Sequence, residues 1–136
     1  MSQELDDIVQ RLAEMTAIGA RDRLWLRRQK NIVIQYEFTD DDALHTYHSV
    51  VHGTEWKFGE GALPDQDCDV ILRTTPTVLR DVLAGVTGGR EAMLSGRLAM
   101  RKGPSHPKLL LMRAIFNRYT KAQERGELVD LNAAAG

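Results

Sequence analysis

Residues 69–103 read DVILRTTPTVLRDVLAGVTGGREAMLSGRLAMRKG, and this stretch contains a complete succession of local structure signals. The short apolar run from Val70 to Arg73 predicts a strand. Thr75 followed by Pro76 is the pattern of a helix N-cap and a first helical residue, and Gly85 marks the end of that helix. The first half of the stretch is therefore expected to form a strand followed directly by a helix.

In the second half of the stretch, a predicted helix comes before a predicted strand. Residues 89–95 predict a second short helix, which ends at a glycine. Leu98 and Met100 then alternate with Arg97 and Arg101, which predicts a strand with one charged face. The sheet is thus expected to gain another strand after two consecutive helices.

Upstream of this stretch, the pattern predicts one helix and a meander. Residues 2–19 have an N-cap serine, an acidic first turn and apolar side chains at helical spacing. A basic connector over 21–30 leads to residues 32–38, which alternate as a strand with one buried face. Residues 44–52 and 56–58 are rich in β-forming side chains and follow turn residues. Three antiparallel strands are the simplest interpretation.

Downstream of Gly103, two prolines precede a last helix, with Ser105 or His106 as its cap and Pro107 at its first position. Gly126 follows its basic final turn, and residues 127–136 are expected to form a loose tail. At ~100° per residue, apolar side chains cover one broad face of this helix. This apolar surface is larger than a helix needs to pack on one sheet. The excess is either part of the core or the wall of a cavity. The apolar face comprises Leu109, Leu111, Met112, Ile115, Phe116, Tyr119 and Ala122.

Composition limits the class of protein. The chain of 136 residues and 15.3 kDa, with 43% hydrophobic and 27% charged residues, fits one soluble globular domain over 1–136. The longest apolar run, 109–112, is far shorter than the roughly 20 residues of a membrane span, and residues 1–10 do not resemble a signal peptide. Cys68 is the only cysteine, which excludes an internal disulfide and favours a cytoplasmic location.

Charge is unevenly distributed along the chain. Residues 97–125 hold eight bases and one acid, a net charge of +7, although the whole chain carries −1. Arg113, Arg118, Lys121 and Arg125 take the face of the last helix opposite its apolar side chains. This basic face is predicted to meet an anionic membrane surface or an acidic partner protein, unless it is only solvated.

Residues able to carry chemistry do not form a recognisable catalytic or metal site. His48 and His52 would stand roughly 13 Å apart on one strand, so they are interpreted as surface or edge histidines. Acidic neighbours should raise the pKa of the Cys68 thiol and suppress a nucleophilic thiolate. The glycines at 85–89 lack nucleotide-loop spacing, and Ser95 lacks a nucleophile elbow. We therefore expect no enzyme activity, no metal, no cofactor and no nucleic-acid partner.

The order of elements in residues 69–103, with Arg-Thr-Thr-Pro, Ala-Gly, Ser-Gly and Arg-Leu at their junctions, resembles the sterol carrier protein domain family. The resemblance spans residues from about 30 to 122, is weaker before residue 69, and includes the segment from Trp56 to Glu60. It implies an α+β domain with a mainly antiparallel sheet of about five strands, covered by helices. Residues 1–28 would then be an N-terminal helix and connector.

The resemblance also implies a non-enzymatic function, in which an apolar tunnel between sheet and helices binds and presents or transfers a sterol, a fatty acyl chain or another lipid. Methionines suit an irregular apolar ligand. Each residue of the implied tunnel wall is equally well explained as part of a packed core without a ligand. The implied liners are Trp56, Phe58, Leu79, Leu83, Met93, Leu94, Leu98, Met100, Met112, Ile115 and Phe116.

Two features leave alternatives open. The segment from Lys102 to Pro107 departs from the family pattern, because its prolines stiffen the connection to a helix that must move to admit a ligand. The polarised charge instead suits an accessory or scaffold protein that binds partner enzymes of lipid or isoprenoid-quinone metabolism.

Overall fold

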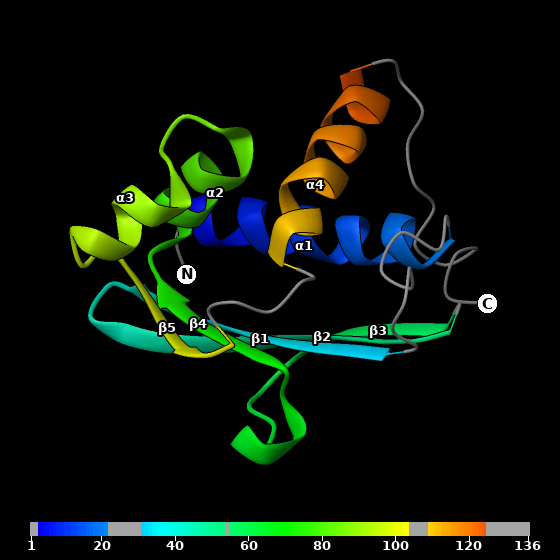
Figure 1. Ribbon diagram of the computed structural model, residues 1–136, viewed down its shortest axis with the longest axis horizontal. Helices are drawn as coiled ribbons and strands as arrows, with labels where there is room; N and C mark the ends of the chain where they lie inside the picture. Colours follow the sequence, from blue (N-terminus) through cyan, green and yellow to red (C-terminus); the bar gives the residue numbers. More distant parts are fainter. Residues whose placement is uncertain (1–2, 22–30, 54, 104–108, 125–136) are drawn as a thin grey trace.

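The computed structural model describes residues 3–21, 31–53, 55–103 and 109–124. Within them, one sheet carries helices on one of its faces (Figure 1). The elements are α1 (Gln3–Arg21), β1 (Asn31–Asp40), β2 (Ala43–His52), β3 (Glu55–Glu60), the 3₁₀ turn η2 (Asp65–Asp67), β4 (Val70–Thr74), α2 (Pro76–Ala84), α3 (Gly89–Leu94), β5 (Leu98–Lys102) and α4 (Leu109–Glu124).

The sheet is mixed, with the strand order β3-β2-β1-β4-β5. The predicted meander is confirmed, because β2 pairs antiparallel with both β1 and β3. β4 and β5 also pair antiparallel, but β1 and β4 are parallel, so the expected mainly antiparallel sheet has one exception at its centre. The exception arises because the chain leaves β3 and crosses the face of the sheet opposite the helices, the outer face. It then enters β4 beside β1 and in the same direction as β1. Side-chain alternation is the same in both orientations, so the sequence does not reveal it.

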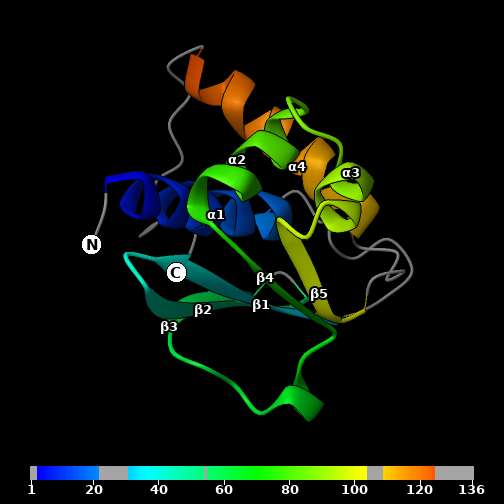
Figure 2. The same ribbon diagram turned by 90° about the vertical axis from the view of Figure 1, so that its left-hand side faces the viewer.

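The helices cover one face of the sheet, and the core lies between the two layers (Figures 1 and 2). Every second residue of β1 points to this side, as the alternation predicted, and Ile34, Tyr36 and Phe38 are 0% exposed. α1 packs its apolar stripe on the same core at the spacing that brings successive turns to one face. The buried large side chains of α1 are Leu5, Ile8, Leu12, Met15 and Ile18.

The outer face of the sheet is also covered, which corrects the expectation of one buried face. Gln35 is 1% and Glu37 is 3% exposed, although both alternate with the apolar residues of β1. The segment 61–69, which contains η2, passes across this face (Figure 1). Its Leu63 amide donates to Gln35 Oε1 at 2.8 Å. Glu37 is covered by arginines from β4 and β5.

The helix boundaries follow the sequence signals where the structure describes them. Thr75 Oγ1 accepts a hydrogen bond from the Val78 amide at 3.2 Å, and Gly85 ends α2 with φ of 79°, as predicted. α1 continues two residues beyond Gly19, to Arg21. The proposed caps at Ser2, 105–107 and Gly126, the connector 22–30 and the tail 127–136 lie outside the described residues.

Candidate functional site

The predicted ligand contacts divide into a large buried group and two surface residues. Nine of them lie in or against one apolar cluster between the helices and the sheet. Their positions on four elements, β3, α2, β5 and α4, bring methylene, thioether and aromatic groups together without an ionised side chain among them. The buried members are Leu79, Leu83, Leu98, Met112, Ile115 and Phe116, and the partly buried members packed on them are Trp56, Phe58 and Met100.

The spacing of these residues explains how two helices share the cluster. Leu79 and Leu83 are one turn apart on α2, so they face the same side. On α4, Met112, Phe116 and Tyr119 are similarly spaced and are 2–4% exposed. α4 packs against both α1 and α2. The three helices therefore close the apolar cluster from the side away from the sheet.

Met93 and Leu94 lie outside this cluster. Their side chains are 39% and 79% exposed, because α3 directs only Ala92 into the core. Val86, in the turn before α3, is 74% exposed. Met93 and Leu94 therefore do not contribute to the interior between helices and sheet.

Aromatic rings from the meander line the sheet side of the cluster. Tyr36 stacks on Phe38 with ring centroids 6.3 Å apart, and Tyr47 stacks on Phe58 at 6.0 Å. The two pairs also contact each other through Tyr36 and Phe58 at 6.3 Å. Planar side chains with few rotatable bonds give the sheet side a stiffer surface than the leucines and methionines opposite it.

A short polar chain crosses this otherwise apolar layer. Thr16 Oγ1 donates to the Leu12 carbonyl at 2.7 Å and lies 2.9 Å from Ser49 Oγ. Ser49 Oγ in turn donates to the Tyr36 hydroxyl at 3.5 Å. Burial raises the pKa of Tyr36 to about 12, and the bond from Ser49 opposes this rise only partly. The phenol is therefore neutral near pH 7, and the contact between Thr16 and Ser49 joins α1 to β2 of the sheet.

The charged groups of the outer face neutralise each other. Arg101 donates to both oxygens of Glu37, from Nε at 2.7 Å and from Nη2 at 2.8 Å, and Arg73 Nε donates at 3.1 Å. Arg101 also reaches Asp65 in η2, with Nη1 3.1 Å from Oδ2. The bonds from Arg101 lower the pKa of Glu37 to about 2, against the opposing effect of burial. The Arg101–Asp65 pair holds the segment 61–69 on the sheet, and the pairs with Glu37 join β1 to β4 and β5.

Two residues considered for chemistry are buried where this segment meets the sheet: Cys68 belongs to the segment, and His48 lies on β2. Burial is the main cause that raises the pKa of the Cys68 thiol, followed by Asp65, so the predicted direction is confirmed with a different leading cause. Cys68 Sγ lies 3.8 Å from Gln35 Oε1. His48 is 6% exposed, with Nδ1 2.9 Å from the Gly61 carbonyl oxygen. The prediction of a surface histidine is wrong there, because segment 61–69 covers it.

The basic face of α4 is described in part. Arg118 and Lys121 are exposed, whereas Arg125 and the side chain of Arg113 lie outside what the structure describes. No helix in the described ranges has the length and apolar character needed to cross a membrane. Within the same ranges, no group of three His, Cys, Asp or Glu side chains is placed to hold a metal ion.

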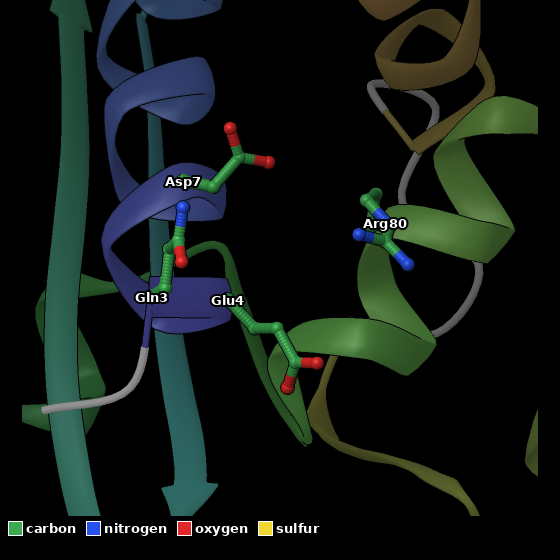
Figure 3. A pocket seen from close by; sticks show the side chains of 4 residues that line it. All are labelled: Gln3, Glu4, Asp7 and Arg80. Carbon is green, nitrogen blue, oxygen red and sulfur yellow. The ribbon is translucent and has the colours of Figure 1, made fainter.

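A polar cavity between α1 and α2 was missed by the sequence interpretation (Figure 3). It has a volume of about 470 Å³ and is lined by Gln3, Glu4, Asp7 and Arg80. The only sequence signal was the spacing of Glu4 and Asp7, which places both carboxylates on one face of α1. As acidic residues near the start of α1, both are also explained by helix stability alone.

Solved structures share this arrangement of sheet and helices. Sterol carrier protein 2 of Aedes aegypti, solved as a complex with palmitate, matches with a TM-score of 0.58 and 18% identity over 85% of this chain and 96% of that one. The apo form of sterol carrier protein 2 from Yarrowia lipolytica matches with a TM-score of 0.53 and 12% identity over 82% and 85%. The chain has the sterol carrier protein fold.

The other comparisons set the scope of this conclusion. No protein-family model and no curated protein sequence matches the chain. A sec-alkylsulfatase from Pseudomonas matches with a TM-score of 0.52 and 15% identity, over 74% of this chain but only 13% of the enzyme. The sterol carrier protein fold is thus confirmed at the level of architecture, and the chain corresponds to a small part of that larger enzyme.

Proposed function

We propose that the protein binds a hydrophobic ligand, such as a fatty acyl chain or a sterol, between its helices and its sheet, and presents or transfers it without catalysis. The observation that carries this proposal is the gathering of nine predicted contacts into one apolar cluster. The palmitate complex of the Aedes aegypti protein, which has the same fold, supports the ligand class.

The energetics of the cluster suit such a ligand. Transfer of apolar surface from water contributes roughly 25 cal/mol per Å², so an acyl chain needs few polar contacts to bind. Met100 and Met112 flank the cluster from β5 and α4, and their flexible thioethers adapt to an irregular molecule. The apolar contacts between the helices and the sheet are non-directional. A ligand therefore enters by replacing them with its own apolar contacts.

The test compares two methionines that differ in their surroundings. Met112 is 4% exposed within the cluster, whereas Met93 is 39% exposed on α3. The variant Met112→Gln replaces the thioether of Met112 by an amide and so buries a polar group against the ligand. This change should weaken palmitate binding about tenfold or more. Met93→Gln is the matched control and should bind palmitate as the unaltered protein does.

Fluorescence titration with a labelled fatty acid gives the affinities, and circular dichroism checks that both variants are folded. If Met112→Gln does not fold, photo-crosslinking of a diazirine fatty acid to the unaltered protein replaces it, with crosslinks expected on the cluster residues. Absence of fatty-acid binding, equal affinity of both variants, or crosslinks confined to the surface would each overturn the proposal.

A second function is favoured by the exposed cations of α4. We propose that Arg118 and Lys121 help to dock the protein on an anionic membrane surface or on an acidic enzyme of lipid or isoprenoid-quinone metabolism. The +7 charge of residues 97–125 supports this. The double variant Arg118→Glu and Lys121→Glu should lose salt-sensitive binding to anionic vesicles or to the partner. Unchanged binding would contradict the docking role and leave the apolar cluster unaffected.

A further inference from the structure

The polar cavity between α1 and α2 lies apart from the apolar cluster and presents opposite charges on its two sides. Glu4 and Asp7 extend from α1, and Arg80 extends from α2 towards them (Figure 3). It is open to solvent, and its volume is about 470 Å³. The cavity therefore has room for a ligand between the two helices.

These charges do not bridge the cavity. Arg80 pairs within its own helix, with Nε 3.8 Å from Asp81 Oδ1, and Asp7 Oδ2 accepts from Arg11 Nε at 3.0 Å. In the described part of the chain, no ion pair joins Arg80 to Glu4 or Asp7. The guanidinium and the two carboxylates thus face one another across open space, and each retains hydrogen-bonding capacity.

The side chains define the chemistry of a complementary ligand. A guanidinium binds phosphate oxygens through parallel N–H donors, and carboxylates accept hydrogen bonds from an ammonium group, which carries three donors. A quaternary ammonium has no N–H donors and is usually held by aromatic rings, none of which lines this cavity. The cavity therefore suits a primary ammonium at Glu4 and Asp7 and a phosphate at Arg80.

We propose that this cavity binds a group carrying both a primary ammonium and a phosphate, as in phosphoethanolamine or the headgroup of an ethanolamine phospholipid. The lipid form rests on the proposed function. Leu5 and Ile8 on α1 and Leu79 on α2 belong to the buried cluster, and each is adjacent in sequence to a lining residue. A headgroup in the cavity would place its chain next to the apolar layer between helices and sheet.

The experiment titrates the ¹⁵N-labelled full chain with three probes and follows amide shifts in α1 and α2. Phosphoethanolamine should shift these amides, and phosphocholine should bind about tenfold more weakly because it cannot donate to the carboxylates. A short-chain lysophosphatidylethanolamine, used below its micelle concentration, distinguishes the sources. Tighter binding than phosphoethanolamine identifies a lipid headgroup, and equal binding identifies the free phosphoamine.

Matched variants assign the binding to the cavity. Arg80→Ala and Glu4→Gln should each weaken phosphoethanolamine binding about tenfold, since each removes a charged hydrogen-bonding partner. Both positions are partly or fully exposed, so the variants are expected to fold. Arg90→Ala and Glu91→Gln change the same residue types on α3, where both are exposed, and should leave binding unchanged.

Palmitate is titrated in parallel, so that the two proposals fail separately. If palmitate binds but the phosphoamine probes cause no shifts in α1 and α2, the cavity assignment is overturned and lipid binding stands. Equal affinity for phosphocholine, or equal losses in the α3 variants, would also overturn it. If phosphoethanolamine binds while palmitate and the lysolipid do not, the cavity assignment stands and the proposed lipid function fails.

Discussion

The two faces of the central strand β1 are both buried, but by different physical means. On the helix side, Tyr36 and Phe38 are covered by apolar side chains of other elements. On the outer side, Gln35 accepts a hydrogen bond from Leu63 of segment 61–69, and Glu37 accepts hydrogen bonds from Arg73 of β4 and Arg101 of β5. Apolar contacts are interchangeable, whereas each bond of the outer face has one partner and one geometry.

This difference indicates which face is able to accept a ligand. A hydrophobic molecule replaces one set of apolar contacts by another, so the helix side loses little when the layers part. Parting segment 61–69 from the outer side would break the Arg101–Asp65 ion pair and leave the buried Gln35 without the bond from Leu63. The sheet therefore has one adaptable face and one face that is fixed by charge.

The largest expected effect is on the helix side. Phe38 is 0% exposed and contacts two other aromatic rings, so Phe38→Ala should lower the free energy of unfolding by about 4 kcal/mol. Urea unfolding followed by circular dichroism measures this. Leu44→Ala, at a residue that is 50% exposed, is the control and should change stability by less than about 0.5 kcal/mol. A loss below about 1 kcal/mol for Phe38→Ala would mean that the apolar face is not closely packed.

The outer face predicts a somewhat smaller loss. Glu37→Gln keeps the shape of the side chain but removes the charge that Arg73 and Arg101 bind, which should cost about 3 kcal/mol. Glu91→Gln is the matched control, because the Glu91 side chain is 73% exposed and its Oε1 lies 4.0 Å from Arg97 Nη2. This control should leave the free energy of unfolding nearly unchanged. Similar unfolding curves for the two variants would contradict the view that charge fixes this face.

Acid should weaken the outer face selectively. Binding to Arg101 lowers the pKa of Glu37 to about 2 from an ordinary value of 4.5, so its ionised form stabilises the folded state above pH 4.5. That contribution is lost as pH falls from 4.5 towards 2. The stability difference between the unaltered protein and Glu37→Gln should therefore be constant near neutrality and shrink over this range. Urea titrations at stepped pH values measure it, and a pH-independent difference would rule out the carboxylate as its source.

The smallest effect tests the polar chain on the apolar face. Thr16→Val removes the hydroxyl that bonds to Leu12 and contacts Ser49, which should cost about 1 kcal/mol. Thr16→Ser keeps the hydroxyl and loses only a methyl group. Thermal unfolding of both variants separates the two contributions. A loss as large as that of Glu37→Gln would show that directed bonds govern both faces.

Much of the fold was predictable because its signals are local. The Thr75-Pro76 start and the Gly85 end of α2 depend on a few adjacent residues, and so does the alternation of β1. Burial of Glu37 was not predictable, since its partner Arg101 comes from the far edge of the sheet. The parallel pairing of β1 and β4 was hidden for the same reason, because it depends on how the intervening chain crosses the sheet.

The candidate site shows the same limit. Leu79, Leu83 and Phe116 could be placed in the core because helical spacing identifies a buried face. α3 is only six residues long, too short for spacing to show which side it buries, and Leu94 is at the surface. The cavity of Glu4 and Arg80 was invisible because it depends on the relative placement of two helices.

The parallel pairing of β1 and β4 has a consequence for the order in which the chain folds. β1, β2 and β3 are joined by short turns. The centre of the sheet is complete only when β1 pairs with β4, in which residue 34 lies opposite residue 70. Closing a long loop costs more entropy than closing a turn, so we expect the meander to form first and β4 and β5 to dock on it. Pulsed hydrogen exchange during refolding should then protect the β1–β2 amides before those of β4–β5. The β1–β2 part of the sheet would thus take shape before β4 and β5 complete it.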